Sequence, residues 1–223
     1  WLQQRADIPF SPGVIEYLNA LSASLLKDPQ SRIYPDVVTF AFFCRKANLL
    51  KLSEEYKNNE LRLGRGMIFH IAPSNVPINF AYSLVAGLLT GNYNVVRVSS
   101  KQFPQVDLVI KHIAIIAESY AEVSNRIALV RYEHTSNAND IFSAESNVRM
   151  IWGGDNTIQT LRQSKSPARS FDVCFADRYS MAVINADVMV SETNIRSVAE
   201  KFYNDTYLFD QNACSAPHLV VWL

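Results

Sequence analysis

The sequence predicts a doubly wound α/β fold with a mainly parallel sheet, preceded by an N-terminal helical segment. Two observations carry this prediction. From residue 66 onward, short apolar runs alternate with amphipathic segments of helical length, a pattern typical of right-handed βαβ crossovers. No Asp, Glu, Lys or Arg occurs between Arg65 and Arg97, which indicates elements buried on several sides. Helices are therefore expected to cover both faces of the sheet.

The first sixty residues are predicted to be helical. Ser11 before Pro12 is a helix start signal. A second helix is expected over 35–56, after a polar connection at 27–32. On the first helix, four apolar residues recur at helical spacing and define one buried face: Val14, Leu18, Leu21 and Leu25.

The remaining elements follow in alternation. Five helices are expected from amphipathic spacing, over 78–89, 106–120, 138–144, 155–162 and 194–209. Apolar runs of strand length predict strands over 66–71, 94–98, 127–132, 148–152, 171–175, 181–184 and 218–223.

Composition narrows the class of protein. The 223 residues are 48% hydrophobic, and 21 basic side chains balance 21 acidic ones, so no general attraction to nucleic acid or to an anionic membrane is expected. The apolar run 80–89 is too short to span a bilayer. Three cysteines without C-x-x-C spacing and four scattered histidines predict neither a disulfide framework nor a metal site. A reducing cytoplasm fits this cysteine usage best.

The loops after the strands are the predicted place for chemistry, because doubly wound sheets bind ligands beyond the carboxyl ends of their strands. In the loop 72–77, Asn75 stands between Pro73 and Pro77. At the mouth of the sheet, its amide could donate a hydrogen bond to an oxygen that becomes negative during a reaction. The local sequence by itself favours a turn asparagine with no further role.

A polar loop at 210–217 holds a cysteine between a helix and a strand. Cys214 could be a nucleophile if its environment favours the thiolate, since a free thiol with a pKa of about 8.5 is only slightly ionised at neutral pH. An inert buried cysteine is the alternative. That alternative is preferred for Cys44 and Cys174, because each lies in an apolar run.

Four segments in order and spacing resemble the aldehyde dehydrogenase superfamily, and within it the acyl-CoA reductases related to the fatty acid reductase of bacterial luminescence. They read APSNVP at 72–77, GNYNVVRVSSK at 91–101, WGGD at 152–155 and QNACS at 211–215. The resemblance extends from about residue 66 to the end of the chain. It implies an aldehyde dehydrogenase-like coenzyme domain, and an oxyanion hole formed by Asn75 and the backbone N–H of Cys214.

One departure from the family pattern bears on the reaction. Water-using aldehyde dehydrogenases place a glutamate in the strand that here reads FDVCF at 171–175, where it activates water. No glutamate stands there. Asp172 is nearest, but period-two alternation lets it point away from the site. We therefore expect the acyl group on Cys214 to be left for a thiol or a hydride. The resemblance implies NADPH-dependent reduction of an acyl-CoA, or of another activated fatty acyl group, to the aldehyde.

The resemblance also implies a nicotinamide dinucleotide, for which NADPH is favoured. A 2′-phosphate about 4 Å from Lys101 would gain a few kcal/mol of electrostatic attraction at an effective dielectric near 20. A solvated lysine that binds nothing is the alternative. Arg97 could also bind the 2′-phosphate. Gly153 and Gly154 open a helix whose backbone amides can approach a pyrophosphate, although a tight turn explains the same residues. The residues expected to contact the cofactor are Pro73, Ser74, Ser99, Ser100, Lys101, Gly153 and Gly154.

We expect three parts in the chain: a helical segment over 1–60, a dinucleotide-binding α/β domain over 61–212, and a nucleophile loop over 213–223. Family members continue with a catalytic lobe after the cysteine, so we interpret the third part as the start of a lobe that is missing here. We expect the chain as given to be a fragment that binds nucleotide better than it catalyses the reaction. The sequence leaves three kinds of partner open: an acyl donor, an acyl-transferring partner protein and further copies of the chain in a homo-oligomer.

Three alternative functions stay open at this point. The chain could be a non-catalytic module that binds nucleotide or acyl groups, or part of a water-using aldehyde dehydrogenase. It could also be a cysteine hydrolase in which His218 activates Cys214, although a strand-opening residue four positions away is awkwardly placed to take the thiol proton.

Overall fold

The computed structural model describes residues 6–133, 136–207 and 211–223. The chain separates into two compact units, Trp1–Phe175 and Ala176–Leu223. The predicted strand 181–184 and the described part of the predicted helix 194–209 therefore group with residues 213–223 rather than with the five-stranded sheet. The predicted assignment of 61–212 to one functional domain stays a prediction.

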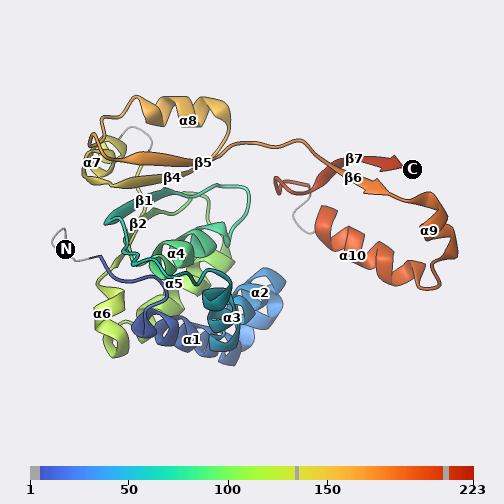
Figure 1. Cartoon of the computed structure of the whole chain (residues 1–223), viewed down its shortest axis with the longest axis horizontal. Coiled ribbons are helices and arrows are strands. Elements are labelled where there is room, and N and C mark those ends of the chain that lie inside the picture. Colours follow the sequence, from blue (N-terminus) through green and yellow to red (C-terminus); the bar gives the residue numbers. More distant parts are fainter. Residues whose placement is uncertain (1–5, 134–135, 208–210) are drawn as a thin grey trace. The chain divides into compact units, whose positions relative to one another are not determined.

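The first unit is built on a five-stranded parallel sheet in the order β3-β2-β1-β4-β5 (Figure 1). The chain first adds strands on one side of β1 and then returns to add β4 and β5 on the other side, which is the doubly wound arrangement. The predicted fold class is thereby confirmed. The strands are β1 (Met67–Ile71), β2 (Tyr93–Arg97), β3 (Ile127–Val130), β4 (Val148–Trp152) and β5 (Phe171–Phe175).

Helices cover both faces of this sheet, as predicted (Figure 1). Successive side chains of β1 point to opposite faces of the sheet. The Phe69 ring lies 5.3 Å from the Phe142 ring on one face, and His70 is hydrogen-bonded to Ser83 on the other. The Phe69 face carries α7 (Ala138–Glu145) and α8 (Asp155–Arg162), and the His70 face carries α4 (Asn79–Leu89) and α5 (Pro104–Ile116).

The N-terminal helices share one hydrophobic core with α4 and α5. They are α1 (Pro12–Lys27), α2 (Pro35–Phe43) and α3 (Lys46–Glu55), and the 3-10 helix η1 (Pro29–Ile33) connects α1 to α2. All four residues predicted to form the buried face of the first helix are at most 1% exposed. This face is the point at which the helical segment is attached to the α/β unit.

The single helix predicted over 35–56 is wrong, because the chain breaks at Cys44 and Arg45. Arg45 has extended backbone angles and caps α3. Side-chain hydrogen bonds stabilise both helix ends at this break. The Lys46 N–H at the start of α3 donates to the Asn19 side chain (3.0 Å), and the Asn48 amide donates to the Phe42 carbonyl at the end of α2 (2.7 Å). These contacts satisfy groups at the two helix ends, which the apolar periodicity does not reveal.

Several other boundaries differ from the predictions by one to four residues, and at Gly66 the structure gives the reason. Gly66 has a φ of +119°, and a Cβ there would collide with the Asn147 side chain, so β1 begins one residue later than predicted. The helix predicted over 106–120 begins at Pro104, ends at Ile116, and is followed by η2 (Glu118–Tyr120) and α6 (Ala121–Ser124).

The second unit holds a two-stranded parallel sheet formed by β6 (Ser180–Ile184) and β7 (Pro217–Trp222). Between them come α9 (Ala186–Ser191) and α10 (Ile195–Tyr207). The short α9 was not predicted; the Asn185 side chain caps it by accepting from the Val188 N–H (2.9 Å). The end of the helix predicted over 194–209 lies outside the described residues. In the described part of the chain, every helix is too short or too polar to cross a bilayer.

Acid is expected to weaken the junction between η1 and α5. Asp28 accepts hydrogen bonds from the Gln30 N–H (2.9 Å), Lys111 Nζ (3.0 Å) and His112 Nε2 (3.1 Å), and these contacts lower its pKa to about 2. A depressed carboxyl pKa stabilises the fold above the unfolded-state value and loses this contribution as the pH falls from about 4 to about 2. Urea unfolding at pH 5 and pH 2.5 should show a smaller acid loss in Asp28→Asn than in the wild type. An identical loss in both would contradict the assignment.

Candidate functional site

The carboxyl ends of β1, β2 and β4 meet at one edge of the sheet. Ile71 pairs with Arg97 on one side and with Ile151 on the other, so the loops that follow these strands start side by side. The Ala72 N–H donates to the Arg97 carbonyl (3.2 Å) and extends the ladder into the first loop. Strand order reverses between β1 and β4, and this reversal is where doubly wound sheets bind ligands.

The loop 72–77 presents polar groups at this edge. Ser74 and Asn75 are exposed, whereas Pro73 is half-buried. The loop ends in a turn in which the Asn79 N–H donates to the Val76 carbonyl (3.3 Å), and α4 begins there. Asn75 therefore lies at the carboxyl edge, as the sequence predicts, and its role as an oxyanion donor stays a prediction.

The next loop brings hydroxyls and a cation to the same edge. Ser99 Oγ accepts from the Lys101 N–H (3.1 Å), and the side chains of Ser100 and Lys101 are exposed. At the end of β2, the Arg97 guanidinium lies over the Tyr132 ring, 4.9 Å from its centroid. Its orientation is thus set by an aromatic neighbour.

The two glycines follow β4 directly. The Gly153 N–H donates to the Phe175 carbonyl (3.2 Å), and Gly154 is the N-cap residue of α8. A Cβ at Gly153 would lie 3.1 Å from Thr157, so a side chain fits there only if Thr157 shifts. The close turn keeps the start of α8 at the edge where β1 and β2 also end.

Asp172 is fixed in a structural ion pair on the α8 side of the sheet. Its carboxylate accepts from Arg149 Nε (2.7 Å) and Nη2 (3.1 Å), and also from Arg162 Nε (3.2 Å). Arg149 Nη1 donates in addition to the carbonyls of Leu161 (2.7 Å) and Ser164 (3.2 Å). The alternation predicted for β5 thus holds at Asp172, which balances a buried cation.

Cys214 lies in the second unit, in a turn that precedes β7. The Ala216 N–H donates to the Ala213 carbonyl (3.0 Å), which places Cys214 and Ser215 at the centre of a β-turn. The Ser180 hydroxyl donates to the Cys214 carbonyl (2.7 Å) and ties this turn to β6. The cysteine is exposed, whereas Ala216 and Pro217 after it are buried.

The other cysteines and the histidine after the turn have different surroundings. Cys44 is fully buried, and burial raises the pKa of its thiol. Cys174 Sγ lies 3.6 Å from Arg162 Nη2 on the α8 side of the sheet. The His218 ring stacks on the Tyr179 ring at 5.3 Å. Among the described residues, no group of three His, Cys, Asp or Glu side chains could hold a metal ion.

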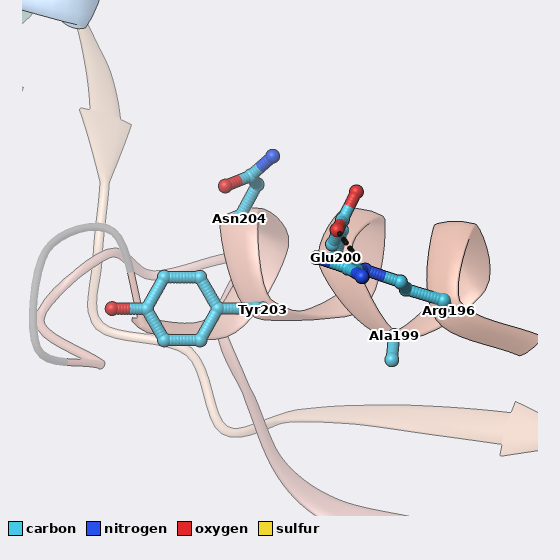
Figure 2. A pocket seen from close by; sticks show the side chains of 5 residues that line it. All are labelled: Arg196, Ala199, Glu200, Tyr203 and Asn204. Atoms are coloured by element: carbon cyan, nitrogen blue, oxygen red, sulfur yellow. Dashed lines mark hydrogen bonds and ion pairs between the residues drawn. The ribbon is translucent and has the colours of Figure 1, made fainter.

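A hollow lies on the surface of α10. Figure 2 shows that its lining side chains all come from this one helix. Arg196 Nε donates to Glu200 across one helical turn (3.0 Å). The lining residues are Arg196, Ala199, Glu200, Tyr203 and Asn204, and none of the predicted site residues is among them.

A buried hydrogen-bonded cluster was missed from the sequence. His70, Ser83 and Trp152 come from β1, α4 and β4, and they are linked through the Ser83 hydroxyl. A histidine inside an apolar strand and a serine inside an apolar helix were the available signals. Neither signal reveals that the two side chains meet.

Solved aldehyde dehydrogenases have a similar fold. A betaine aldehyde dehydrogenase from Staphylococcus aureus, solved in complex with NAD+, superposes with a TM-score of 0.66; it is 14% identical, over 94% of this chain and 45% of that one. The molecule thus has the aldehyde dehydrogenase fold. The family model described as acyl-CoA reductase (LuxC) matches residues 45–222. The chain belongs to this acyl-CoA reductase family.

Two curated relatives agree with this membership. The long-chain acyl-protein thioester reductase 2 of Photobacterium leiognathi is 25% identical over 156 residues, which cover 68% of this chain and 31% of the relative. The long-chain acyl-protein thioester reductase of Vibrio harveyi is 26% identical over 154 residues, which cover 67% and 30%. The chain thus spans about a third of the length of these relatives.

Proposed function

We propose that this protein reduces an activated fatty acyl group, carried as a thioester, to the aldehyde through a thioacyl intermediate on Cys214. The observation that carries the proposal is the exposed cysteine at the centre of a tethered turn, in a chain of the acyl-CoA reductase family. The curated relatives are named for acyl-protein thioesters, and the family for acyl-CoA. Both donors are thioesters, and the rates at which they label the protein distinguish them.

In the proposed reaction, the Cys214 thiolate attacks the carbonyl carbon of the thioester. The tetrahedral oxyanion is stabilised by the Asn75 amide and the Cys214 backbone N–H, as the family resemblance implies. The bond from carbon to the donor sulfur then breaks, and the donor leaves as a thiol after taking up a proton. After hydride addition to the thioacyl carbon, the resulting oxyanion collapses to the carbonyl. The bond from carbon to the Cys214 sulfur breaks, and the aldehyde and the Cys214 thiolate are released.

A nicotinamide dinucleotide fits the groups at the carboxyl edge of the sheet. The edge offers the Gly153–Gly154 turn at the start of α8 and the exposed groups of Ser100 and Lys101, a donor set suited to phosphates. When bound, the reduced cofactor supplies the hydride for the thioacyl carbon. NADPH is the proposed form, and Pro73, Ser74 and Ser99 complete the proposed contacts.

The ion pair of Asp172 favours reduction over hydrolysis. A general base must reach the water that it activates. Asp172 instead accepts hydrogen bonds from two arginines on the α8 side of the sheet. A thioacyl group on Cys214 would therefore lack a carboxylate base from this strand, which leaves it available to a hydride.

The proposal is tested by mass spectrometry of the intact protein after mixing with a long-chain acyl-CoA, or with the same chain on a protein thiol. We expect a mass gain of one acyl group that is absent in Cys214→Ala and retained in Cys174→Ala. The donor that labels the protein faster identifies the substrate class. No adduct with either donor favours a non-catalytic binding module and contradicts the proposal. Turnover of the thioester to free acid without any nicotinamide would instead indicate a cysteine hydrolase.

Lys101→Glu tests the phosphate assignment. The substitution places a negative charge where the 2′-phosphate of NADPH is proposed to bind, and the repulsion should raise the dissociation constant for NADPH about tenfold or more. The dissociation constant for NADH should change little. Isothermal titration calorimetry measures both values, and Lys165→Glu on the exposed loop before β5 is the matched control. An equal loss for both dinucleotides would dispose of the assignment.

A further inference from the structure

Two aromatic rings form a stacked pair at the carboxyl edge of the sheet. Trp152 and Phe175 end β4 and β5, are paired in register, and stack with centroids 3.8 Å apart and an angle of 8° between their planes. Phe175 is 39% exposed. The Gly153–Gly154 turn follows directly, so the rings lie beside the proposed phosphate-binding turn.

The indole is held in place by a hydrogen bond to α4. Trp152 Nε1 donates to Ser83 Oγ (3.2 Å), and Ser83 Oγ lies 2.8 Å from His70 Nδ1. On its other side, His70 Nε2 lies 2.9 Å from Asn94 Oδ1. The Asn94 amide in turn donates to the Asn92 carbonyl (3.1 Å).

These contacts assign a direction to the whole chain of hydrogen bonds. Because the Asn94 NH2 group is used on Asn92, its oxygen is the acceptor toward His70, and His70 Nε2 carries the proton. Burial lowers the pKa of His70 to about 4, so the ring is neutral at pH 7 and Nδ1 is an acceptor. Ser83 Oγ also lies 2.9 Å from Met150 Sδ. The Ser83 hydroxyl therefore donates toward these two acceptors, His70 Nδ1 and Met150 Sδ, and accepts from Trp152 Nε1.

Close packing around these hydrogen-bonded side chains leaves them little freedom to rearrange. A Cβ at Gly87 would collide with the Asn94 side chain and lie 3.1 Å from His70 Nε2. His70 is fully buried, and Ser83 is 2% exposed. The orientation of the indole is thus determined by groups of β1, β2 and α4, although the ring itself stands at the ligand-binding edge.

We propose that the Trp152–Phe175 ring pair forms a wall of the dinucleotide site, and that Ser83 and His70 are positioning residues that hold Trp152 there. The inference rests on the proposed function, because it concerns the proposed cofactor. Aromatic walls with a few fixed polar groups are usual in cofactor sites. Here, the polar end of the indole points inward, so the rings offer an apolar surface to a planar ligand.

Tryptophan fluorescence during titration with NADP+ and NADPH tests this inference. The chain has three tryptophans, Trp1, Trp152 and Trp222. We expect emission to fall on binding in the wild type and in Trp222→Phe, and to change little in Trp152→Phe. Ser83→Ala should weaken NADP+ binding about tenfold. Ser143→Ala is the matched control, since it removes another buried hydroxyl, one without a hydrogen-bond partner among the described residues, and should bind like the wild type.

The outcomes separate this inference from the proposed function. If calorimetry shows that the wild type binds NADP+ or NADPH, yet Trp152→Phe keeps the full fluorescence change, the wall is wrong and the proposed cofactor stands. Wild-type affinity in Ser83→Ala would likewise overturn the positioning role. If the wild type binds neither dinucleotide, both proposals fail. Thermal melts report whether Ser83→Ala folds, and Trp152→Phe supplies the test if it does not.

Discussion

Asp172→Ala is expected to lower the free energy of unfolding of the first unit by about 3–5 kcal/mol. Arg149 is 4% exposed, and its guanidinium depends on two hydrogen bonds from Nε and Nη2 to Asp172. Without the carboxylate, the buried cation keeps only the carbonyls of Leu161 and Ser164. An unbalanced buried charge is among the most destabilising single changes in a protein.

Urea unfolding followed by circular dichroism measures this effect. Asp177→Ala removes an exposed carboxylate two residues after β5 and should change stability by less than about 0.5 kcal/mol. Replacing both partners, with Arg149→Met and Asp172→Leu together, should recover most of the loss because no buried charge is then left unpaired and Arg162 is exposed to solvent. A loss below about 1 kcal/mol in Asp172→Ala would show that the pair contributes no more than a surface ion pair.

Asn75→Ala is expected to slow reduction of the acyl thioester about a hundredfold, which corresponds to about 3 kcal/mol of transition-state stabilisation. The effect should appear in kcat rather than in KM, because the amide is proposed to serve the oxyanion and not the bound substrate. Asn75 is exposed at the carboxyl edge of the sheet.

Oxidation of NADPH in the presence of acyl thioester, followed by absorbance, measures this rate. Asn58→Ala, in the exposed segment before β1, is the matched control and should react like the wild type. A change of less than about threefold in Asn75→Ala would remove this residue from the proposed oxyanion hole and leave the thioacyl step on Cys214 to be judged by mass spectrometry. Oxidation of aldehydes to free acids with NAD would instead support a water-using aldehyde dehydrogenase.

Local sequence patterns predict most elements of the first unit but not its long-range contacts. The strands over 148–152 and 171–175 and the helix over 155–162 have the predicted limits, because their apolar spacing and their glycine or polar boundaries are local signals. The break at Cys44 and Arg45 was missed, since the Asn19 side chain that holds it comes from another helix. Contacts between distant residues leave no trace in a periodicity.

The candidate site divides in the same way. The position of Asn75 at the carboxyl edge follows from strand, loop and helix in order, and the exposed turn of Cys214 follows from its polar loop. The contacts of Trp152 do not follow from the sequence, because a tryptophan at the end of an apolar strand predicts only a buried aromatic side chain. Only the packing of α4 against β1 and β4 brings the Ser83 hydroxyl to the indole.

The sequence by itself determined the α/β class, the order of the elements and the likeness to acyl-CoA reductases, because these depend on residue spacing along the chain. The tertiary structure alone decided that Asp172 balances Arg149, that residues from 176 onward form a separate unit, and that His70 and Trp152 both contact the Ser83 hydroxyl. Those features arise where strands and helices distant in sequence pack together, since hydrogen bonds and ion pairs form between neighbours in space.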